Sequence, residues 1–228
     1  MAGEPLRVGV VCFDLYGTLV DLEPLDVACE ALAPGRGAPL AGRWRARQLE
    51  ASWLRTAMDR WADFEVVTRE ALDVACAELS VDPDPGAREA VRRVFLELPL
   101  KAGALEGITD LGRTGLPLAV LSNGSSTMIE AGILSAGIDG RFEALLSADA
   151  ARVYKPHPAV YQLAVDRFGF PPDRIGFVSA NGWDAAGAAA CGFAVAWLRP
   201  PGAVLPAVPA AILGEVTWAT VSGQFAPA

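Results

Sequence analysis

Histidine is almost absent from this chain of 228 residues, and His157 is its single example. A metal site built from several histidines is therefore excluded, and a Ser-His-Asp triad would depend on that one residue. The four cysteines lack the C-x-x-C spacing that is typical of metal and redox sites. No apolar run is long enough to span a bilayer, and the first run is too short for a signal peptide and ends at Asp14. We therefore expect a cytoplasmic protein with no membrane partner.

Positive charge is also scarce. The chain has 19 Lys and Arg residues against 27 Asp and Glu residues, which gives a net charge of −8. Because nucleic-acid phosphates need a basic face, this balance excludes a nucleic-acid partner. It leaves room for a small anionic substrate, since a few local cations are enough to bind one. Hydrophobic residues make up 52% of the chain, enough for a substantial core.

Short apolar runs are what the chain does contain, and helical patterns separate most of them. The predicted strands cover residues 8–13, 116–121, 144–146, 175–178 and 194–198, and the predicted helices cover 126–136, 158–168 and 184–190. This alternation predicts an α/β fold with a Rossmann-like, mostly parallel sheet. Residues 21–98 are rich in helix formers and predict a helical cap subdomain inserted into a core of residues 1–20 and 99–228. We expect the proline-rich segment after Arg199 to cross the surface.

Polar side chains follow several of these strands. Asp14 follows the first strand, and Gly17 allows a sharp turn beside it. The other polar residues at strand ends or in the intervening loop are Ser122, Asn123, Lys155, Ser179, Asn181 and Asp184. Each has an ordinary alternative role in a turn, a helix cap or the solvated surface. Because parallel strands end at one edge of the sheet, their joint placement predicts a single cleft with an anionic nucleophile.

Four segments resemble the motifs of the haloacid dehalogenase superfamily in residue type, order and spacing: residues 14–18, 121–124, 153–156 and 177–184. Residues 44–50 with 53–55 are similar to the cap helix of the L-2-haloacid dehalogenases. The resemblance implies hydrolytic dehalogenation of small L-2-haloalkanoic acids to D-2-hydroxy acids with inversion. It also implies a homodimer whose small-molecule partners are the 2-haloacid and the halide ion.

The resemblance gives each polar residue a role. Asp14 would attack the carbon that bears the halogen and form an ester, while Lys155 keeps Asp14 ionised. Ser122 and the backbone amides of the loop that starts at Leu15 would bind the substrate carboxylate. The remaining catalytic positions are Asp184, ordered by Ser179 and Asn181 to activate water, and Thr18, which holds the Asp14 loop.

The halide and the apolar part of the substrate would have their own partners. Arg45 and Asn123 would receive the halide. On a helix, Arg45 shares a face with Leu49 and Trp53, and its alternative role is to cover apolar surface with its charged end in water. The other expected pocket residues are Tyr16, Leu49, Phe64 and Trp183, with Tyr161 in a supporting role. The residues Ala46, Ala180 and Gly182 differ from those expected in the subfamily, and we expect them to affect the size of the pocket and therefore the substrate range.

The main alternative is a phosphatase of the same superfamily. Such phosphatases carry a second aspartate two positions after the nucleophile, and this chain has Tyr16 there. They also bind Mg²⁺ through paired carboxylates in the last motif, where Asp184 stands alone. The sequence therefore predicts neither a metal nor another cofactor. A non-enzymatic interaction protein on the same fold is the second alternative, and the retained Asp14, Lys155 and Asp184 argue against it.

Overall fold

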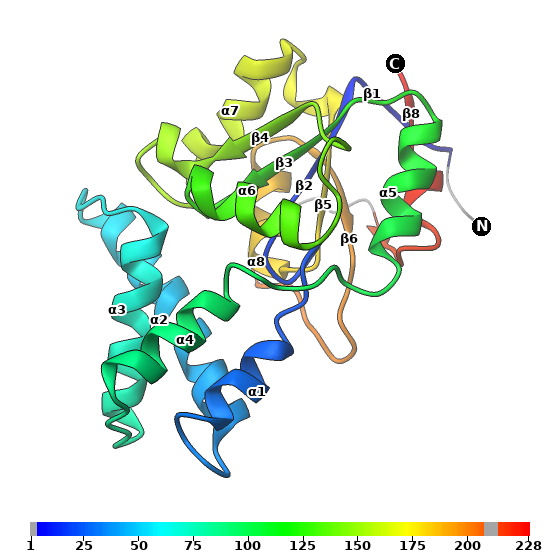
Figure 1. Ribbon diagram of the computed structural model, residues 1–228. Helices are drawn as coiled ribbons and strands as arrows, with labels where there is room; N and C mark the ends of the chain where they lie inside the picture. The colour runs from blue at the N-terminus through cyan, green and yellow to red at the C-terminus, as the bar shows by residue number, and fades with distance from the viewer. Residues whose placement is uncertain (1–3, 208–213) are drawn as a thin grey trace.

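A six-stranded parallel sheet forms the centre of the molecule in the computed structural model, which describes residues 4–207 and 214–228 (Figure 1). The strand order is β4-β3-β2-β5-β6-β7. The strands are β2 (Val10–Phe13), β3 (Leu118–Ser122), β4 (Ala144–Ser147), β5 (Ile175–Ser179), β6 (Ala194–Trp197) and β7 (Gly214–Glu215). Every residue of β2, β3 and β5 is buried, as expected for strands covered on both faces. The predicted Rossmann-like α/β core is confirmed.

Helices cover both faces of this sheet. Figure 1 shows α6 on the near face and α8 on the far face. The core helices are α5 (Ala104–Arg113), α6 (Ser126–Ser135), α7 (Pro158–Phe168) and α8 (Gly182–Ala190), with 3-10 turns at Ala148–Ala150, Pro172–Arg174 and Val221–Gln224. Ser125 caps α6 by accepting a hydrogen bond from the Met128 amide, and Pro158 occupies the first turn of α7. No helix of the described residues is both long and apolar enough to cross a membrane.

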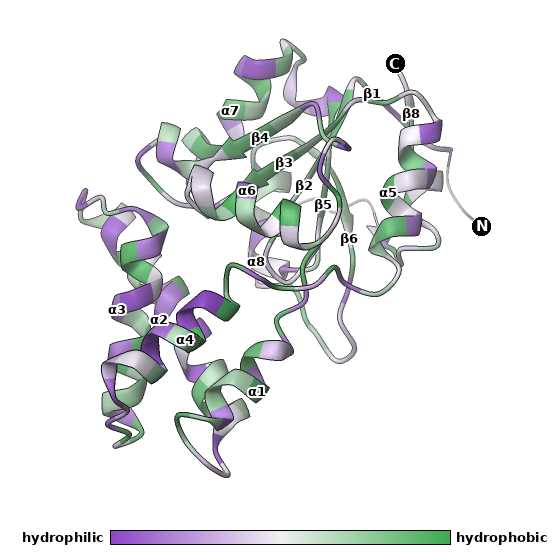
Figure 2. Cartoon of the chain, viewed as in Figure 1, coloured by the Kyte–Doolittle hydropathy of each residue, from purple (hydrophilic) through white to green (hydrophobic). Residues whose placement is uncertain are grey.

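A helical cap is inserted between β2 and α5 and lies to one side of the sheet (Figure 1), as predicted. Its helices are α1 (Pro24–Glu30), α2 (Gly37–Ala57), α3 (Phe64–Glu78) and α4 (Pro85–Val94). Asp63 and Asp84 cap α3 and α4. Figure 2 shows hydrophilic stretches along these helices and mainly hydrophobic strands in the core, which is the pattern of amphipathic helices beside a fully buried sheet.

Two predicted features differ from the structure. The first apolar run forms two strands, β1 (Leu6–Val8) and β2, which Gly9 separates, because β1 pairs with β8 while β2 pairs with β3 and β5. The C-terminal segment was expected to cross the surface, and this is wrong for residues 214–228. They add β7 to the sheet, and β8 (Phe225–Pro227) pairs with β1.

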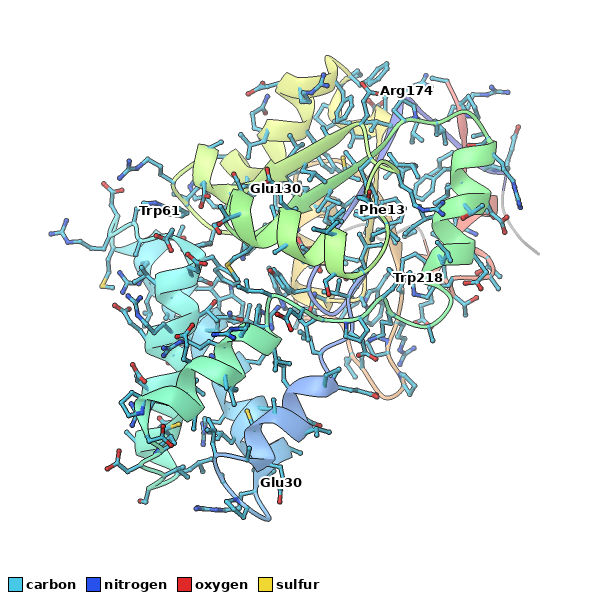
Figure 3. The ribbon with its side chains drawn as sticks, in the orientation of Figure 1. Phe13, Glu30, Trp61, Glu130, Arg174 and Trp218 are labelled. Atoms are coloured by element: carbon cyan, nitrogen blue, oxygen red, sulfur yellow. The ribbon has the colours of Figure 1, made fainter. Side chains whose placement is uncertain are left out.

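Aromatic packing explains how this C-terminal segment is held. Trp218 stacks on Phe13 with ring centroids 6.2 Å apart, beside α5 (Figure 3). Gly107 allows the contact, since a Cβ atom there would lie 2.6 Å from the indole ring. Val221 and Phe225 are buried next to it. Burial of these apolar side chains stabilises the segment against the core, which a proline-rich composition did not indicate.

Candidate active site

Asp14 lies directly after β2, at the centre of the carboxyl edge of the sheet, and is only 5% exposed. Its Oδ2 accepts hydrogen bonds from Thr18 Oγ1 at 2.8 Å and Asn181 Nδ2 at 2.7 Å. Its Oδ1 accepts one from Lys155 Nζ at 3.2 Å. Charged and neutral donors thus hold both oxygens of the carboxylate, and this fixes the orientation of a nucleophile.

The loop after Asp14 offers backbone donors. The amides of Leu15 and Tyr16 have no acceptor among the described residues, whereas Gly17 donates to the Val20 carbonyl at 2.9 Å. Gly17 has a φ of +81°, which favours glycine and lets the loop fold back. The Leu15 side chain points to α6, where it would contact a Cβ atom on Gly132 at 3.6 Å. Leu15 can therefore bind a substrate only through its backbone.

Lys155 connects the two buried carboxylates. Its Nζ lies 3.2 Å from Asp14 Oδ1 and 2.8 Å from Asp184 Oδ2, and all three side chains are buried. Burial by itself lowers the pKa of Lys155, but the charges of Asp184 and Asp14 outweigh it and raise the pKa above its ordinary value. The Lys155 amide donates to Asn123 Oδ1 at 2.8 Å, which ties this loop to the end of β3.

Asp184 sits at the start of α8 and is fully buried. Burial raises the pKa of its carboxyl, and the charge of Lys155 acts against this rise. Tyr161 donates to Asp184 Oδ1 at 2.7 Å, and Ser179 donates to Asp184 Oδ2 at 3.3 Å. A carboxylate with a raised pKa is a better base, so Asp184 is equipped to take a proton from water.

Two expected contacts are different in the structure. The Asn181 side chain does not order Asp184; it donates to Asp14 and to the Tyr16 carbonyl at 3.0 Å. Tyr161 was grouped with the substrate-binding residues, yet its buried hydroxyl bonds Asp184. Its position on an ordinary helix face gave no sign of this contact, because the contact depends on how α7 packs directly against α8 in the folded chain.

The end of β3 provides two further donors. Ser122 Oγ accepts a hydrogen bond from the Gly124 amide at 3.1 Å, which leaves its own proton for a ligand. Asn123 uses Oδ1 for Lys155, and its buried Nδ2 has no partner among the described residues. A buried amide donor without an acceptor is unfavourable by itself, so this Nδ2 is suited to an anion.

Arg45 extends from α2 of the cap and is partly buried. Burial lowers the pKa of its guanidinium, and the negative charges of Asp14 and Asp184 act in the opposite direction. It donates a hydrogen bond to Gln48 Oε1. Gln48 was not among the predicted site residues, although its spacing of three residues from Arg45 on one helix could have indicated the contact.

Aromatic side chains from the cap and the core surround this group. Tyr16 lies 4.8 Å from Phe95 and 6.4 Å from Phe64 between ring centroids, and its hydroxyl faces the Met128 carbonyl. Leu49 lies half-buried on α2. Phe64 and Tyr16 are thus next to each other as expected, and Phe95 was missed because it follows α4, far away in sequence.

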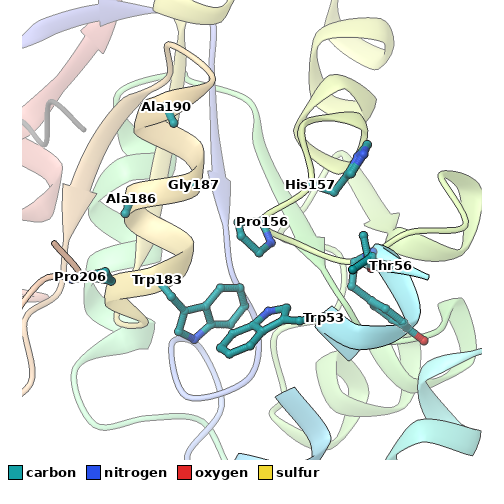
Figure 4. A pocket seen from close by; sticks show the side chains of 11 residues that line it. Trp53, Thr56, Pro156, His157, Trp183, Ala186, Gly187, Ala190 and Pro206 are labelled. Atoms are coloured by element: carbon teal, nitrogen blue, oxygen red, sulfur yellow. The ribbon is translucent and has the colours of Figure 1, made fainter. Parts of the chain in front are cut away.

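The cap and the core also meet at two tryptophans. Trp183 meets Trp53 edge to face at 5.7 Å, and Trp53 Nε1 donates to the Lys155 carbonyl at 3.2 Å. The pair borders an open, mainly apolar cavity of 590 Å³ between α2, α8 and the loop of Pro156 and His157 (Figure 4). No residue that bonds the Asp14 carboxylate lines this cavity.

A divalent cation does not fit the arrangement around Asp14. The ammonium group of Lys155 lies between the carboxylates of Asp14 and Asp184 and already supplies a positive charge to both. The described residues contain no group of three Asp, Glu, His or Cys side chains arranged to hold a metal. Tyr16 supplies no carboxylate to add to such a site.

The Rossmann-like core, the helical cap and the buried carboxylate at the sheet edge are the arrangement of a hydrolase. A family model of haloacid dehalogenase-like hydrolases matches residues 8–192, and the chain belongs to that family. Its similarity to characterised members places it in the L-2-haloacid dehalogenase subfamily.

Three relatives show how far this similarity extends. Haloacetate dehalogenase H-2 of Moraxella sp. (strain B) is 40% identical over 196 residues, which cover 85% of this chain and 86% of that protein. The (S)-2-haloacid dehalogenase of Pseudomonas sp. (strain YL) is 40% identical over 194 residues, with 85% and 84% covered. The structure of L-2-haloacid dehalogenase from Xanthobacter autotrophicus with chloropropionic acid covalently bound matches with a TM-score of 0.79 at 40% identity and covers 84% and 77% of the two chains.

Proposed function

We propose that this enzyme hydrolyses small L-2-haloalkanoic acids to D-2-hydroxy acids through an ester on Asp14. The observation that carries the proposal is the buried Asp14 carboxylate, held by Lys155, Thr18 and Asn181 at the sheet edge. The curated relatives that are (S)-2-haloacid dehalogenases support the same reaction.

The first step is displacement at carbon. Asp14 Oδ1 forms a bond to the carbon that bears the halogen, and the halide leaves with the electron pair of the broken bond. The substrate carboxylate is bound by Ser122 and by the free amides of Leu15 and Tyr16. The halide passes to the guanidinium of Arg45 and to Nδ2 of Asn123, which stabilise charge as it develops.

The second step is hydrolysis of the ester. Water gives a proton to Asp184 and attacks the Asp14 carboxyl carbon. The oxyanion forms on Oδ2, where Thr18 and Asn181 already donate hydrogen bonds. The alcohol leaves with Oδ1, and the proton returns to it from Asp184 through Lys155, whose Nζ bonds both groups. Asp14 is left as a carboxylic acid with one oxygen from water, and loss of its proton to solvent restores the carboxylate, so each turnover releases one proton and one halide.

The stereochemistry follows from these two steps. Displacement at carbon requires Asp14 and the halide site to flank the reacting carbon, which inverts it. Ester hydrolysis breaks a bond at the Asp14 carboxyl and leaves the substrate carbon unchanged. One inversion overall converts L-2-chloropropionate to D-lactate, and the preference for the L substrate comes from the subfamily.

We also propose that the reaction needs no metal ion, because Lys155 supplies the positive charge between the two carboxylates. Exhaustive chelation should leave turnover of L-2-chloropropionate unchanged. A large loss that Mg²⁺ restores would contradict this, and hydrolysis of p-nitrophenyl phosphate with Mg²⁺ would then favour the phosphatase.

The covalent route is tested by isotope labelling. In a single turnover in ¹⁸O-water, the label should enter the Asp14 carboxyl, and the product hydroxyl should carry ordinary oxygen from Oδ1. Mass spectrometry of the peptide that contains Asp14 and of the product measures both. A label found in the product alone would show direct attack by water on the substrate. The Asp14→Asn variant is the control, since it should form neither ester nor product.

The proposed division of the chain places the cap at residues 21–98 and the core at residues 1–20 and 99–228. The two connecting segments support these boundaries because they lie side by side: the Asp21 backbone amide donates to the Pro99 carbonyl at 2.8 Å, and the Lys101 backbone amide donates to the Leu19 carbonyl at 2.7 Å. The backbone thus enters and leaves the cap at one place, next to the Asp14 loop.

Few partners are proposed for this enzyme. They are the 2-haloacid, the released halide and a second copy of the chain, and we propose that the homodimer acts in the cytoplasm. Exposed apolar residues at the end of α2 support the dimer.

A further inference from the structure

Arg45 and Arg47 are two residues apart on α2 but have different partners. Arg47 forms ion pairs with Glu50 and Glu78. Arg45 forms no ion pair among the described residues, and its partner is the neutral side-chain carbonyl of Gln48. Arg45 is therefore held in place by a group that leaves its positive charge uncompensated.

Gln48 is completely buried, and the neighbouring helix fixes its orientation. Its Nε2 donates to Thr68 Oγ1 of α3 at 2.5 Å, and Thr68 in turn donates to the Phe64 carbonyl at 2.5 Å. Because the Thr68 proton is used for Phe64, its oxygen acts as an acceptor for Gln48. The amide of Gln48 can then only present its oxygen to Arg45.

The position of α3 relative to α2 is fixed by another contact of the same residue. Trp44 Nε1 donates to the Thr68 backbone carbonyl at 2.8 Å, and Trp44 is buried. Thr68 thus bonds α2 through both its backbone and its side chain. A helix pair that is held twice at one residue gives Gln48 a rigid support.

We propose that Gln48, fixed by Thr68, is a positioning residue that holds the Arg45 guanidinium toward the departing halide while leaving its charge available. The proposal rests on the proposed role of Arg45. A glutamate at residue 48 would hold Arg45 equally well but would compensate its charge. An apolar residue would leave the charge uncompensated but would not hold the side chain.

The experiment compares Gln48→Glu and Gln48→Met with the wild type on L-2-chloropropionate and L-2-bromopropionate. We expect each variant to lose roughly tenfold or more in kcat. Gln48→Met loses a hydrogen bond to a charged group, which is worth about that factor, and Gln48→Glu places a negative charge next to Arg45 that competes with the halide. The loss should be larger for the chloro substrate, because chloride is the poorer leaving group and needs more help. Inhibition by added chloride and bromide should weaken in parallel.

Thr68 and Ser52 provide the matched variants. Thr68→Val should lower kcat in the same direction, and Thr68→Ser should restore it, since the hydroxyl is kept. Ser52→Ala is the control for α2, because the buried Ser52 hydroxyl bonds only the Leu49 carbonyl of its own helix. It should leave the ratio of the two kcat values and the halide inhibition unchanged. The melting temperature of each variant shows whether its loss of kcat comes from lower stability or from a displaced Arg45 side chain.

A structural role alone would give a different result. If Gln48→Glu and Gln48→Met lower the melting temperature but keep the wild-type ratio of bromo to chloro turnover and the wild-type halide inhibition, the proposal is wrong. The Arg45→Lys variant shows whether Arg45 binds the halide at all, which is a separate question from whether Gln48 positions it. Lysine lacks the fixed set of donors, so we expect a loss of roughly a hundredfold. Near-normal turnover in Arg45→Lys would instead show that Arg45 does not bind the halide.

The double variants test the coupling directly. Adding Gln48→Met to Arg45→Lys should cost little further activity, because Gln48 acts through Arg45. Independent, multiplicative losses in the double variant would overturn the proposal.

Discussion

At the scale of single residues, charge is distributed unevenly around the nucleophile. Asp14 and Asp184 share the one ammonium group of Lys155, so these three buried side chains carry a net negative charge. The substrate adds a carboxylate and then a halide to this region. Arg45, which forms no ion pair among the described residues, brings the net charge of these four side chains to zero before substrate binds. The substrate carboxylate must therefore be stabilised by hydrogen-bond donors as well as by the two cations.

The pH dependence of turnover should report Asp184. Burial raises its pKa to about 6 from the ordinary 3.8, and the base for water must be ionised. We expect kcat to fall as the pH decreases through about 6. The effect on stability has the opposite sign, since a raised pKa in the folded state means that protonation at low pH favours folding.

Activity should therefore be lost on the acid side while the protein stays folded. Both statements are checked by measuring steady-state kcat and circular dichroism on one sample. The measurements run from about pH 5 to 8, a range that brackets the raised pKa of a buried carboxyl. An unchanged kcat down to pH 5 would exclude Asp184 as the base. Loss of activity together with loss of secondary structure would show that unfolding limits the enzyme first.

At the scale of elements, helix α8 lies close enough to α7 to make Gly187 critical. A Cβ atom at Gly187 would lie 2.5 Å from the Tyr161 hydroxyl and 2.6 Å from Cβ of Pro156. Gly187→Ala should therefore displace Tyr161 from Asp184, with a loss of about 1–3 kcal/mol in stability and a clear fall in kcat.

Gly112→Ala is the matched control, because Gly112 lies in α5 with no atom within 4 Å of its Cβ position. That change should stabilise the protein by about 0.5–1 kcal/mol through helix propensity and leave kcat unchanged. Chemical denaturation and kcat of both variants decide the matter. If Gly187→Ala behaves like Gly112→Ala, the close contact of α7 and α8 does not support the site.

The same elements show what the sequence predicts and what it does not. Strands β2, β3 and β5 and the polar residues at their ends are predictable, because a buried parallel sheet needs continuous apolar runs and gathers their ends. The partners of Tyr161 and Gln48 are not, since they lie on other helices and are set by packing. The division of the first apolar run at Gly9 is not predictable either, since β1 pairs with β8 at the other end of the chain.

At the scale of the whole molecule, the net charge opposes the proposed substrate. A chain with a charge of −8 repels an anion at long range, while salt screens this repulsion beyond about 10 Å. Attraction must therefore be local, and it comes from Lys155 and Arg45, one supplied by the core and one by the cap. Neither unit alone contains both cations, so the complete site requires the cap to lie against the core.

Exposed apolar side chains at the end of α2 support the proposed homodimer. Leu54 near the end of α2 and Met58, which caps this helix, are 51% and 57% exposed, and Trp53 beside Leu54 in the sequence is 39% exposed. Adjacent exposed apolar side chains of this size mark an association surface. Sedimentation velocity should show twice the mass of one chain, and Leu54→Glu with Met58→Glu should give monomers because charged side chains resist burial there. Leu134→Glu on α6, a residue that is 68% exposed, is the control and should stay dimeric. A wild-type monomer, or a dimer unaffected by both α2 changes, would rule out association through this helix.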